Sequence, residues 1–121
     1  MATQKQIDAI LQKLDSIEGS LGGTLIGKDG MVIATRLDKR YAGDKVAALA
    51  SDAVDTANKV ITEGQFGKPN TMLIEGSDGK MCIINAAKAG IFITIIGTRE
   101  LNIGMARMAL QEAIDSFDDL S

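Results

Sequence analysis

The chain has 121 residues, of which 45% are hydrophobic and 24% are charged, the composition of one ordinary globular domain over residues 1–121. A net charge of −3 without a basic cluster excludes a protein that binds nucleic-acid phosphates, and no apolar run is long enough to predict a membrane span. The absence of histidine, together with a single cysteine, excludes the common zinc sites as well as Ser-His-Asp and Cys-His catalysis.

The N-terminal segment has the pattern of an amphipathic helix. Thr3 and Gln6 have the spacing of a capping box, in which Thr3 is the N-cap and the Gln6 side chain reaches back to it. We expect Gly19 to end this helix. Its buried face is predicted from apolar residues at helical spacing: Ile7, Ile10, Leu11, Leu14 and Ile17.

A β-hairpin is predicted next. The β-prone residues 24–26 and 31–33 flank the turn 28–30, whose Asp-Gly pair is a strong hairpin signal because glycine tolerates positive φ. Gly22 and Gly23 open the first strand, where the missing side chains allow another backbone to approach closely.

The longest helix is predicted from Asp44, its expected N-cap, to Gly64. One apolar stripe runs along it, rich in alanine, and it has two possible uses. It can pack on the chain's own sheet, or it can form a helix–helix contact across a symmetric dimer, and the pattern does not divide the stripe between them. The stripe comprises Val46, Leu49, Ala50, Ala53, Val54, Ala57, Val60 and Ile61.

Three strands and a final helix follow. Residues 71–75, 80–86 and 91–96 are predicted strands, and the last of them is so apolar that we expect it at the centre of the sheet, covered on both faces. Cys82 falls on the second of these strands and is predicted to be a core residue. Asn102 is the expected N-cap of the final helix, whose buried face comprises Ile103, Ala106, Leu110, Ala113, Ile114 and Phe117, with gaps filled by Met105 and Met108.

Candidate chemistry is sparse. Residues 22–28 match the spacing of a phosphate loop, but Asp29 stands where serine or threonine would bind magnesium, and a strand is predicted where the loop needs a helix. Arg36 and Arg40, placed in the loop before the long helix, are candidate contacts for a GTPase, although solvated surface charge is the favoured interpretation. We expect no catalytic residue, no metal and no cofactor.

The expected location is the cytoplasm. Residues 1–14 lack the continuous apolar run of a signal peptide, and one cysteine fits a reducing compartment.

Two segments resemble a known family. Residues 17–19, 23–26 and 29–34 are similar to the opening hairpin of the Roadblock (dynein light-chain Roadblock) family, and residues 101–107 resemble the Asn-Leu-Gly-Leu-Leu-Arg element of its last helix. The predicted element order, αββαβββα, matches that family over almost the whole chain. The resemblance implies an α+β, single-domain sandwich of the Roadblock/longin/profilin-like type, with a five-stranded antiparallel sheet, the long helix on one face and the terminal helices on the other.

The resemblance also implies a homodimer in which the long helices lie antiparallel and the third strands pair. The implied interface comprises Val46, Leu49, Ala50, Ala53, Val54, Ala57, Ile61, Met72 and Ile74.

Three functions remain open at this point. The first, implied by the prokaryotic members of the family, is a non-enzymatic regulator of a small Ras-like GTPase. The second is a light-chain-type scaffold that tethers other proteins. The third is a small-ligand sensor, for which the sequence shows no polar cluster converging on an apolar cavity.

Overall fold

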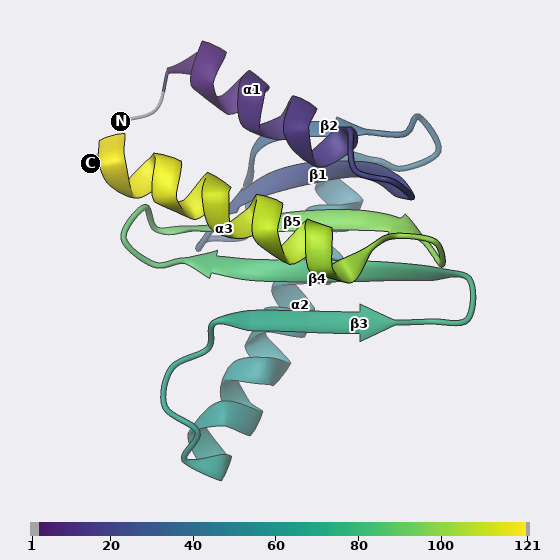
Figure 1. Cartoon of the computed structure of the whole chain (residues 1–121). Coiled ribbons are helices and arrows are strands. Elements are labelled where there is room, and N and C mark those ends of the chain that lie inside the picture. Colours follow the sequence, from purple (N-terminus) through teal and green to yellow (C-terminus); the bar gives the residue numbers. More distant parts are fainter. Residues whose placement is uncertain (1–2, 121) are drawn as a thin grey trace.

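A five-stranded antiparallel sheet forms the middle layer of the molecule, in a computed structural model that describes residues 3–120 (Figure 1). The strand order is β2-β1-β5-β4-β3, so the prediction that the most apolar strand is central is confirmed. Thr94 and Ile95 of this strand are both fully buried although they point to opposite faces. The strands are β1 (Ser20–Gly27), β2 (Val32–Leu37), β3 (Thr71–Glu75), β4 (Gly79–Ala86) and β5 (Ile91–Thr98).

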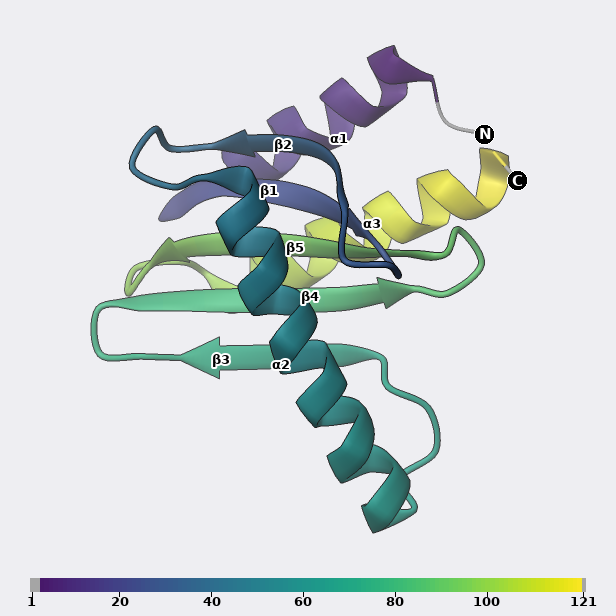
Figure 2. The same cartoon turned by 180° about the vertical axis from the view of Figure 1, so that it is seen from behind.

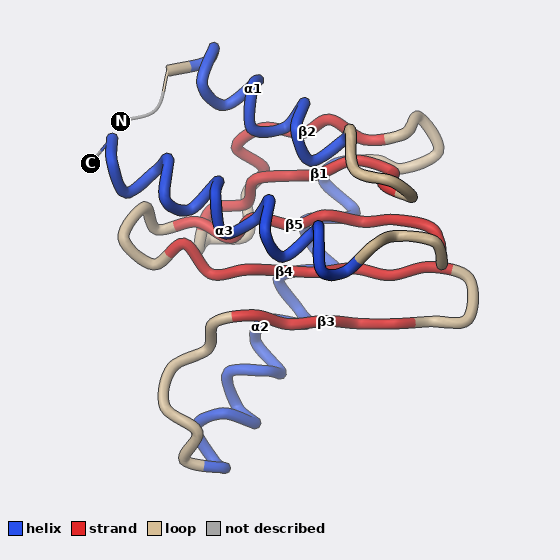
Figure 3. Tube along the Cα trace, viewed as in Figure 1, coloured by secondary structure: helices blue, strands red, loops and turns tan. Residues whose placement is uncertain are grey.

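Helices cover both faces of the sheet. Helices α1 (Gln4–Asp15) and α3 (Ile103–Leu120) lie side by side on one face, and α2 (Gly43–Gly64) crosses the other face obliquely (Figures 1 and 2). The tube in Figure 3 shows the short loops that join the antiparallel strands. The expected order αββαβββα and the expected division of helices between the two faces are confirmed.

The two faces differ in how completely they are covered. The core beneath α1 and α3 is the larger, and it includes Leu14, Leu25, Ile93 and Leu110. The core beneath α2 is small and is built largely on alanine and valine side chains of that helix. A single helix cannot cover a five-stranded face, so apolar surface beside α2 stays accessible.

The helix ends agree only partly with the predictions. The capping box of α1 is confirmed: the Gln6 amide donates to Thr3 Oγ1 over 3.2 Å, and the Thr3 amide donates to Gln6 Oε1 over 2.8 Å. Helix α1 ends at Asp15, four residues before the expected Gly19. That glycine (φ 83°) instead forms the tight turn against Leu101, whose backbone nitrogen would lie 2.4 Å from an added Cβ.

Helix α2 begins one residue before the position expected of its cap. Its N-cap is Ala42, so the prediction of Asp44 as the cap is wrong. Asp44 instead lies in the first turn, where its negative charge interacts favourably with the positive end of the helix dipole. The predicted end at Gly64 is confirmed, and Gln65 follows it in the left-handed conformation at φ 58°.

The first hairpin is confirmed, with its turn at residues 28–30. Asp29 accepts a hydrogen bond from the Met31 amide over 3.0 Å, which stabilises the turn. The close approach expected at the start of β1 is also present, because a Cβ on Gly22 (φ 113°) would lie 2.0 Å from the Arg36 carbonyl oxygen.

Candidate dimer and partner-binding surface

The apolar stripe of α2 divides into a buried part and an accessible part. Val46, Ala50 and Val54 are buried against the chain's own sheet. Leu49, in contrast, is 55% exposed, because it lies on the flank of the helix rather than beneath it. Among the remaining residues of the predicted stripe, Val60 is exposed, and Ala53, Ala57 and Ile61 are half-buried.

A largely apolar groove of about 450 Å³ lies beside the exposed flank of α2. It separates the N-terminal half of the helix from the ends of β3, β4 and β5. Its apolar wall consists of Tyr41, Val46, Leu49, Ile74, Met81 and Ile96, and these residues define the α2 groove. The far end of the groove is lined by Gly76, Gly79 and Gly97, and its wall is shallow there because these residues carry no side chains.

Strand β3 borders this groove and forms an edge of the sheet. Met72 is half-buried in the core under α2, and Ile74, next on the same face, is 45% exposed. The C-terminal part of α2 extends past this edge (Figure 2), and there Val60 is 57% exposed and Phe66 is 70% exposed. An unpaired strand edge beside exposed apolar side chains is typical of an interaction surface.

The two candidate arginines lie apart. Arg36 belongs to β2 and not to the following loop, so its predicted placement is wrong. It lies on the edge of the sheet opposite to β3, and its Nε contacts Asp15 Oδ2 at 3.2 Å. Arg40 does lie in the loop, and its guanidinium group is stacked over the ring of Tyr41, 5.8 Å from the centroid.

Arg40 is also paired with an acidic neighbour. Its Nε donates to Asp38 Oδ1 over 3.1 Å. This hydrogen bond holds the pKa of the Asp38 carboxyl below its usual value and raises the pKa of Arg40. Both groups are therefore charged, and the Asp38 carboxylate partly offsets the positive charge that Arg40 could offer to a phosphate.

Sequence reasoning placed none of Met81, Ile96 and Tyr41 on this surface. Met81 and Ile96 belong to strands, and Tyr41 does not. It lies in a loop outside any periodic pattern, so the only available signal was its identity as the single tyrosine of the chain.

Other expectations concern the core and the opposite face. Cys82 is completely buried, as predicted, and burial raises the pKa of its thiol. Met105 and Met108 were expected to fill gaps in the core, which is wrong, because they are 50% and 66% exposed on α3. Each lies one position before a buried alanine, Met105 before Ala106 and Met108 before Ala109.

Among the described side chains, those of residues 3–117, no three acidic or thiol groups lie close enough to bind a metal ion together. Among the described helices, none is both long and apolar enough to cross a membrane.

The sheet with one oblique helix on one face and two antiparallel helices side by side on the other defines the Roadblock/longin-like class of α+β sandwiches. The sequence profile of the Roadblock/LC7 domain matches residues 6–96, and the chain belongs to this family. The family resemblance seen in the sequence is thereby confirmed.

Relatives and solved structures agree with this membership. The chain is 33% identical to the uncharacterized protein MJ0310 of Methanocaldococcus jannaschii over 109 residues, which are 90% of this chain and 94% of that protein. The crystal structure of a Roadblock/LC7 domain from Streptomyces avermitilis is similar at a TM-score of 0.82 and 19% identity, covering 93% of this chain and 95% of that one. MglB of Myxococcus xanthus is similar at a TM-score of 0.85 and 15% identity, covering 99% and 92%. At such identities the two structures establish a shared fold.

Proposed function

We propose that this protein is a non-enzymatic homodimer that binds a small Ras-like GTPase and modulates its activity. The observation that carries the proposal is the apolar α2 groove beside the unpaired edge of β3. Family membership supports the choice of partner, because the Roadblock resemblance implies regulators of Ras-like GTPases.

The proposed dimer follows from two-fold symmetry. An antiparallel pair of identical strands is self-complementary about a two-fold axis, so two copies of β3 can join two five-stranded sheets into one of ten strands. In this arrangement the projecting C-terminal end of each α2 lies over the α2 groove of the partner protomer. Val60 and Phe66 would then cover Leu49 and Ile74 of the other protomer, and both sets of exposed apolar side chains leave water.

The predicted interface residues divide into two roles in this proposal. Direct contacts come from accessible positions on the helix flank and on β3: Leu49, Ala53, Ala57, Ile61, Met72 and Ile74. Val46, Ala50 and Val54 are buried within the protomer and fix the position of α2 on the sheet from below.

We expect the dimer to act on the GTPase by positioning and not by an arginine finger. Faster GTP hydrolysis requires either a cation at the γ-phosphate or correct placement of the attacking water. Arg36 and Arg40 are each paired with a carboxylate of the same chain. A broad surface formed by two protomers across the axis can hold the switch region without either residue.

The test is a GTP-hydrolysis and binding assay with a small Ras-like GTPase from the same organism. Arg36→Ala and Arg40→Ala should keep most of the effect on hydrolysis, and Leu49→Arg should lose it together with the dimer. Ala48→Arg is the matched control, since Ala48 is exposed on the outward face of the same helix. A collapse of activity in either arginine variant with binding intact would establish a finger, and an unchanged effect in monomeric Leu49→Arg would refute the composite surface.

The light-chain-type scaffold remains the second candidate because of one specific feature. A further apolar groove of about 410 Å³ lies between α1 and α3, lined by Ala9, Ile10, Ala109 and Ala113. If no GTPase from the organism binds the intact dimer, the regulator proposal fails and this groove becomes the surface on which a tethered protein should be sought.

A further inference from the structure

A polar cleft of about 280 Å³ lies on the other flank of α2, away from the α2 groove. It is enclosed by the β1–β2 turn, α2, the loop before β3 and the facing ends of β4 and β5. Its lining combines charged, amide, hydroxyl and apolar side chains, and we define the polar cleft by Lys28, Ser51, Val54, Asp55, Asn58, Pro69, Asn85 and Phe92.

The helix wall of the polar cleft follows from helical periodicity. Ser51, Asp55 and Asn58 are spaced i, i+4 and i+7, so they share one flank of α2. Leu49 and Ala53 lie on the opposite flank, beside the α2 groove. The polar cleft therefore stays open in the proposed dimer, and its existence does not depend on that proposal.

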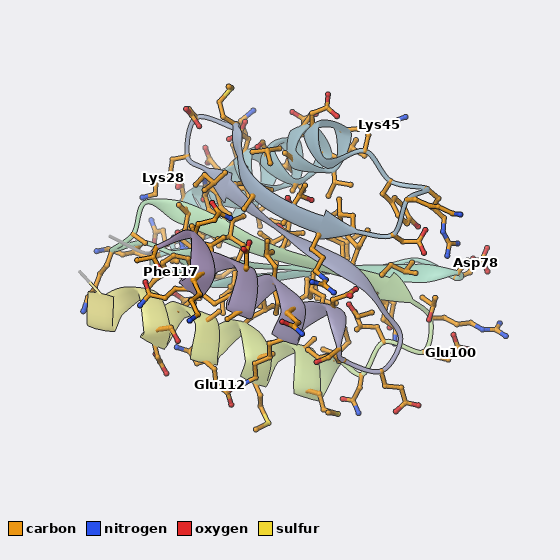
Figure 4. All side chains as sticks on the ribbon, turned by 90° about the horizontal axis from the view of Figure 1, so that it is seen from above. Lys28, Lys45, Asp78, Glu100, Glu112 and Phe117 are labelled. Atoms are coloured by element: carbon orange, nitrogen blue, oxygen red, sulfur yellow. The ribbon has the colours of Figure 1, made fainter. Side chains whose placement is uncertain are left out.

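The hairpin turn forms the second wall. A Cβ built on Gly30 would lie 3.4 Å from Ser51 Oγ, so the turn packs directly against the helix at this point. This contact places Lys28, two residues earlier in the same turn, at the mouth of the cleft. Figure 4 shows Lys28 at the end of the sheet opposite to Asp78.

Asn85 holds the third wall in place. Its side-chain amide donates to the Pro69 carbonyl oxygen over 3.3 Å, and its backbone amide donates to the Asn70 carbonyl oxygen over 2.9 Å. With the amide group oriented by these contacts, Asn85 Oδ1 is left buried without a hydrogen-bond partner among residues 3–120. Because this oxygen has almost no accessible surface, Asn85 holds the wall of the cleft in place and does not itself contact a ligand.

The two charged side chains of the cleft also do not form an ion pair with each other. Lys28 and Asp55 both line it, yet the ion pairs within residues 3–120 include none between them. An anion bound at Lys28, such as phosphate, would face the Asp55 carboxylate and be repelled by it. A ligand with only an ammonium group would leave Lys28 unpaired.

We propose that the polar cleft binds a small zwitterion with the chemistry of a free neutral α-amino acid. The ligand carboxylate pairs with Lys28, and the ligand ammonium group pairs with Asp55. The ligand side chain rests on the apolar floor of Val54 and Phe92. The volume falls just below the usual range for ligand pockets, about 300 Å³ and above, so a ligand of this small size fits.

The test is ¹⁵N–¹H NMR of the full chain titrated separately with L-alanine, L-serine, L-leucine and L-methionine. At about 10 mM, which saturates most of a millimolar site, at least one of them should shift the amide signals of Lys28, Ser51, Asp55 and Asn58. The amidated and N-acetylated forms of the best ligand each lack one charge and should bind about tenfold more weakly, the loss expected for one charge-assisted pair. Inorganic phosphate should produce no shift at these positions.

Matched variants locate the effect. Lys28→Met and Asp55→Asn should each weaken binding about tenfold, whereas Lys5→Met and Asp52→Asn, which change exposed residues outside the cleft, should not. A dispersed spectrum for each variant shows that it remains folded. The proposal is overturned if none of the four amino acids shifts the cleft signals, or if the neutralised ligands and variants bind as well as the originals.

Discussion

Two threonines at the centre of the sheet are the polar residues of its interior, and only one of them has its hydroxyl satisfied. Thr24 of β1 and Thr94 of β5 are directly opposite each other and fully buried. Thr24 Oγ1 donates to the Ala34 carbonyl oxygen over 3.2 Å. Thr94 Oγ1 has no hydrogen-bond partner among residues 3–120. Replacing a buried hydroxyl by a methyl group therefore has opposite expected effects at these two positions.

Thr94→Val should leave stability unchanged or raise it by up to about 1 kcal/mol, because it removes an unsatisfied polar atom without changing the side-chain shape. Thr24→Val, the matched control, should lower stability by about 1 kcal/mol, because the Ala34 carbonyl oxygen loses the hydrogen bond that it accepts from Thr24. Urea denaturation of both variants measures the difference. Equal losses in the two variants would show that Thr94 Oγ1 has a partner in solution.

At the scale of elements, side-chain caps mark the starts of α1 and α3, whereas α2 begins without one. Helix α3 starts where Asn102 accepts a hydrogen bond from the Met105 amide over 3.0 Å. The Asn102 carbonyl oxygen also accepts from the Ala106 amide, which begins the regular pattern. Helix α2 has no side-chain cap, and its start is decided by the loop that leads out of β2. The two helices therefore differ in their sensitivity to a single substitution at the N-terminus.

Asn102→Ala should destabilise the protein by about 1 kcal/mol, since one amide at the start of α3 loses its partner. Asn102→Asp should retain the stability, because aspartate is as good an N-cap as asparagine and its negative charge interacts favourably with the positive end of the helix dipole. The measurement is the free energy of unfolding for the three proteins. If alanine is tolerated as well as aspartate, the cap contributes nothing to stability.

At the scale of the whole molecule, one face of the sheet is covered more completely than the other. Helices α1 and α3 cover the first, and α2 leaves the α2 groove and the β3 edge accessible on the second. A partner that covers the second face would therefore remove the most apolar surface from water and stabilise the chain most. A second copy supplies both a matching strand and a matching apolar helix end.

Wild-type protein should therefore have the mass of a dimer by light scattering. Leu49→Arg should have the mass of a folded monomer, because an unpaired charge in the interface costs about 3–5 kcal/mol while the side chain is tolerated by the accessible flank of the free protomer. Ala48→Arg should remain dimeric. A monomeric wild type, or a dimeric Leu49→Arg, would contradict the proposed interface.

Local patterns were sufficient to predict much of this protein. The order of the elements, the Asp29-Gly30 turn, the capping box of Thr3 and the cap at Asn102 all depend on residues within a few positions of one another. The continuous apolar run of residues 91–96 was also sufficient to predict the central strand. The residues that resemble the Roadblock family lie in these same local motifs.

The tertiary structure decided the features that depend on distant residues. Periodicity defines a stripe on α2 but not the crossing angle of the helix, and that angle determines that Ala50 is buried while Leu49 stays accessible. The partner of Arg36 is Asp15, and the polar cleft unites Lys28, Asp55 and Asn85 from three separate elements. Such convergence follows from the strand order and the placement of α2 over the sheet, which are long-range packing choices that no local sequence pattern encodes.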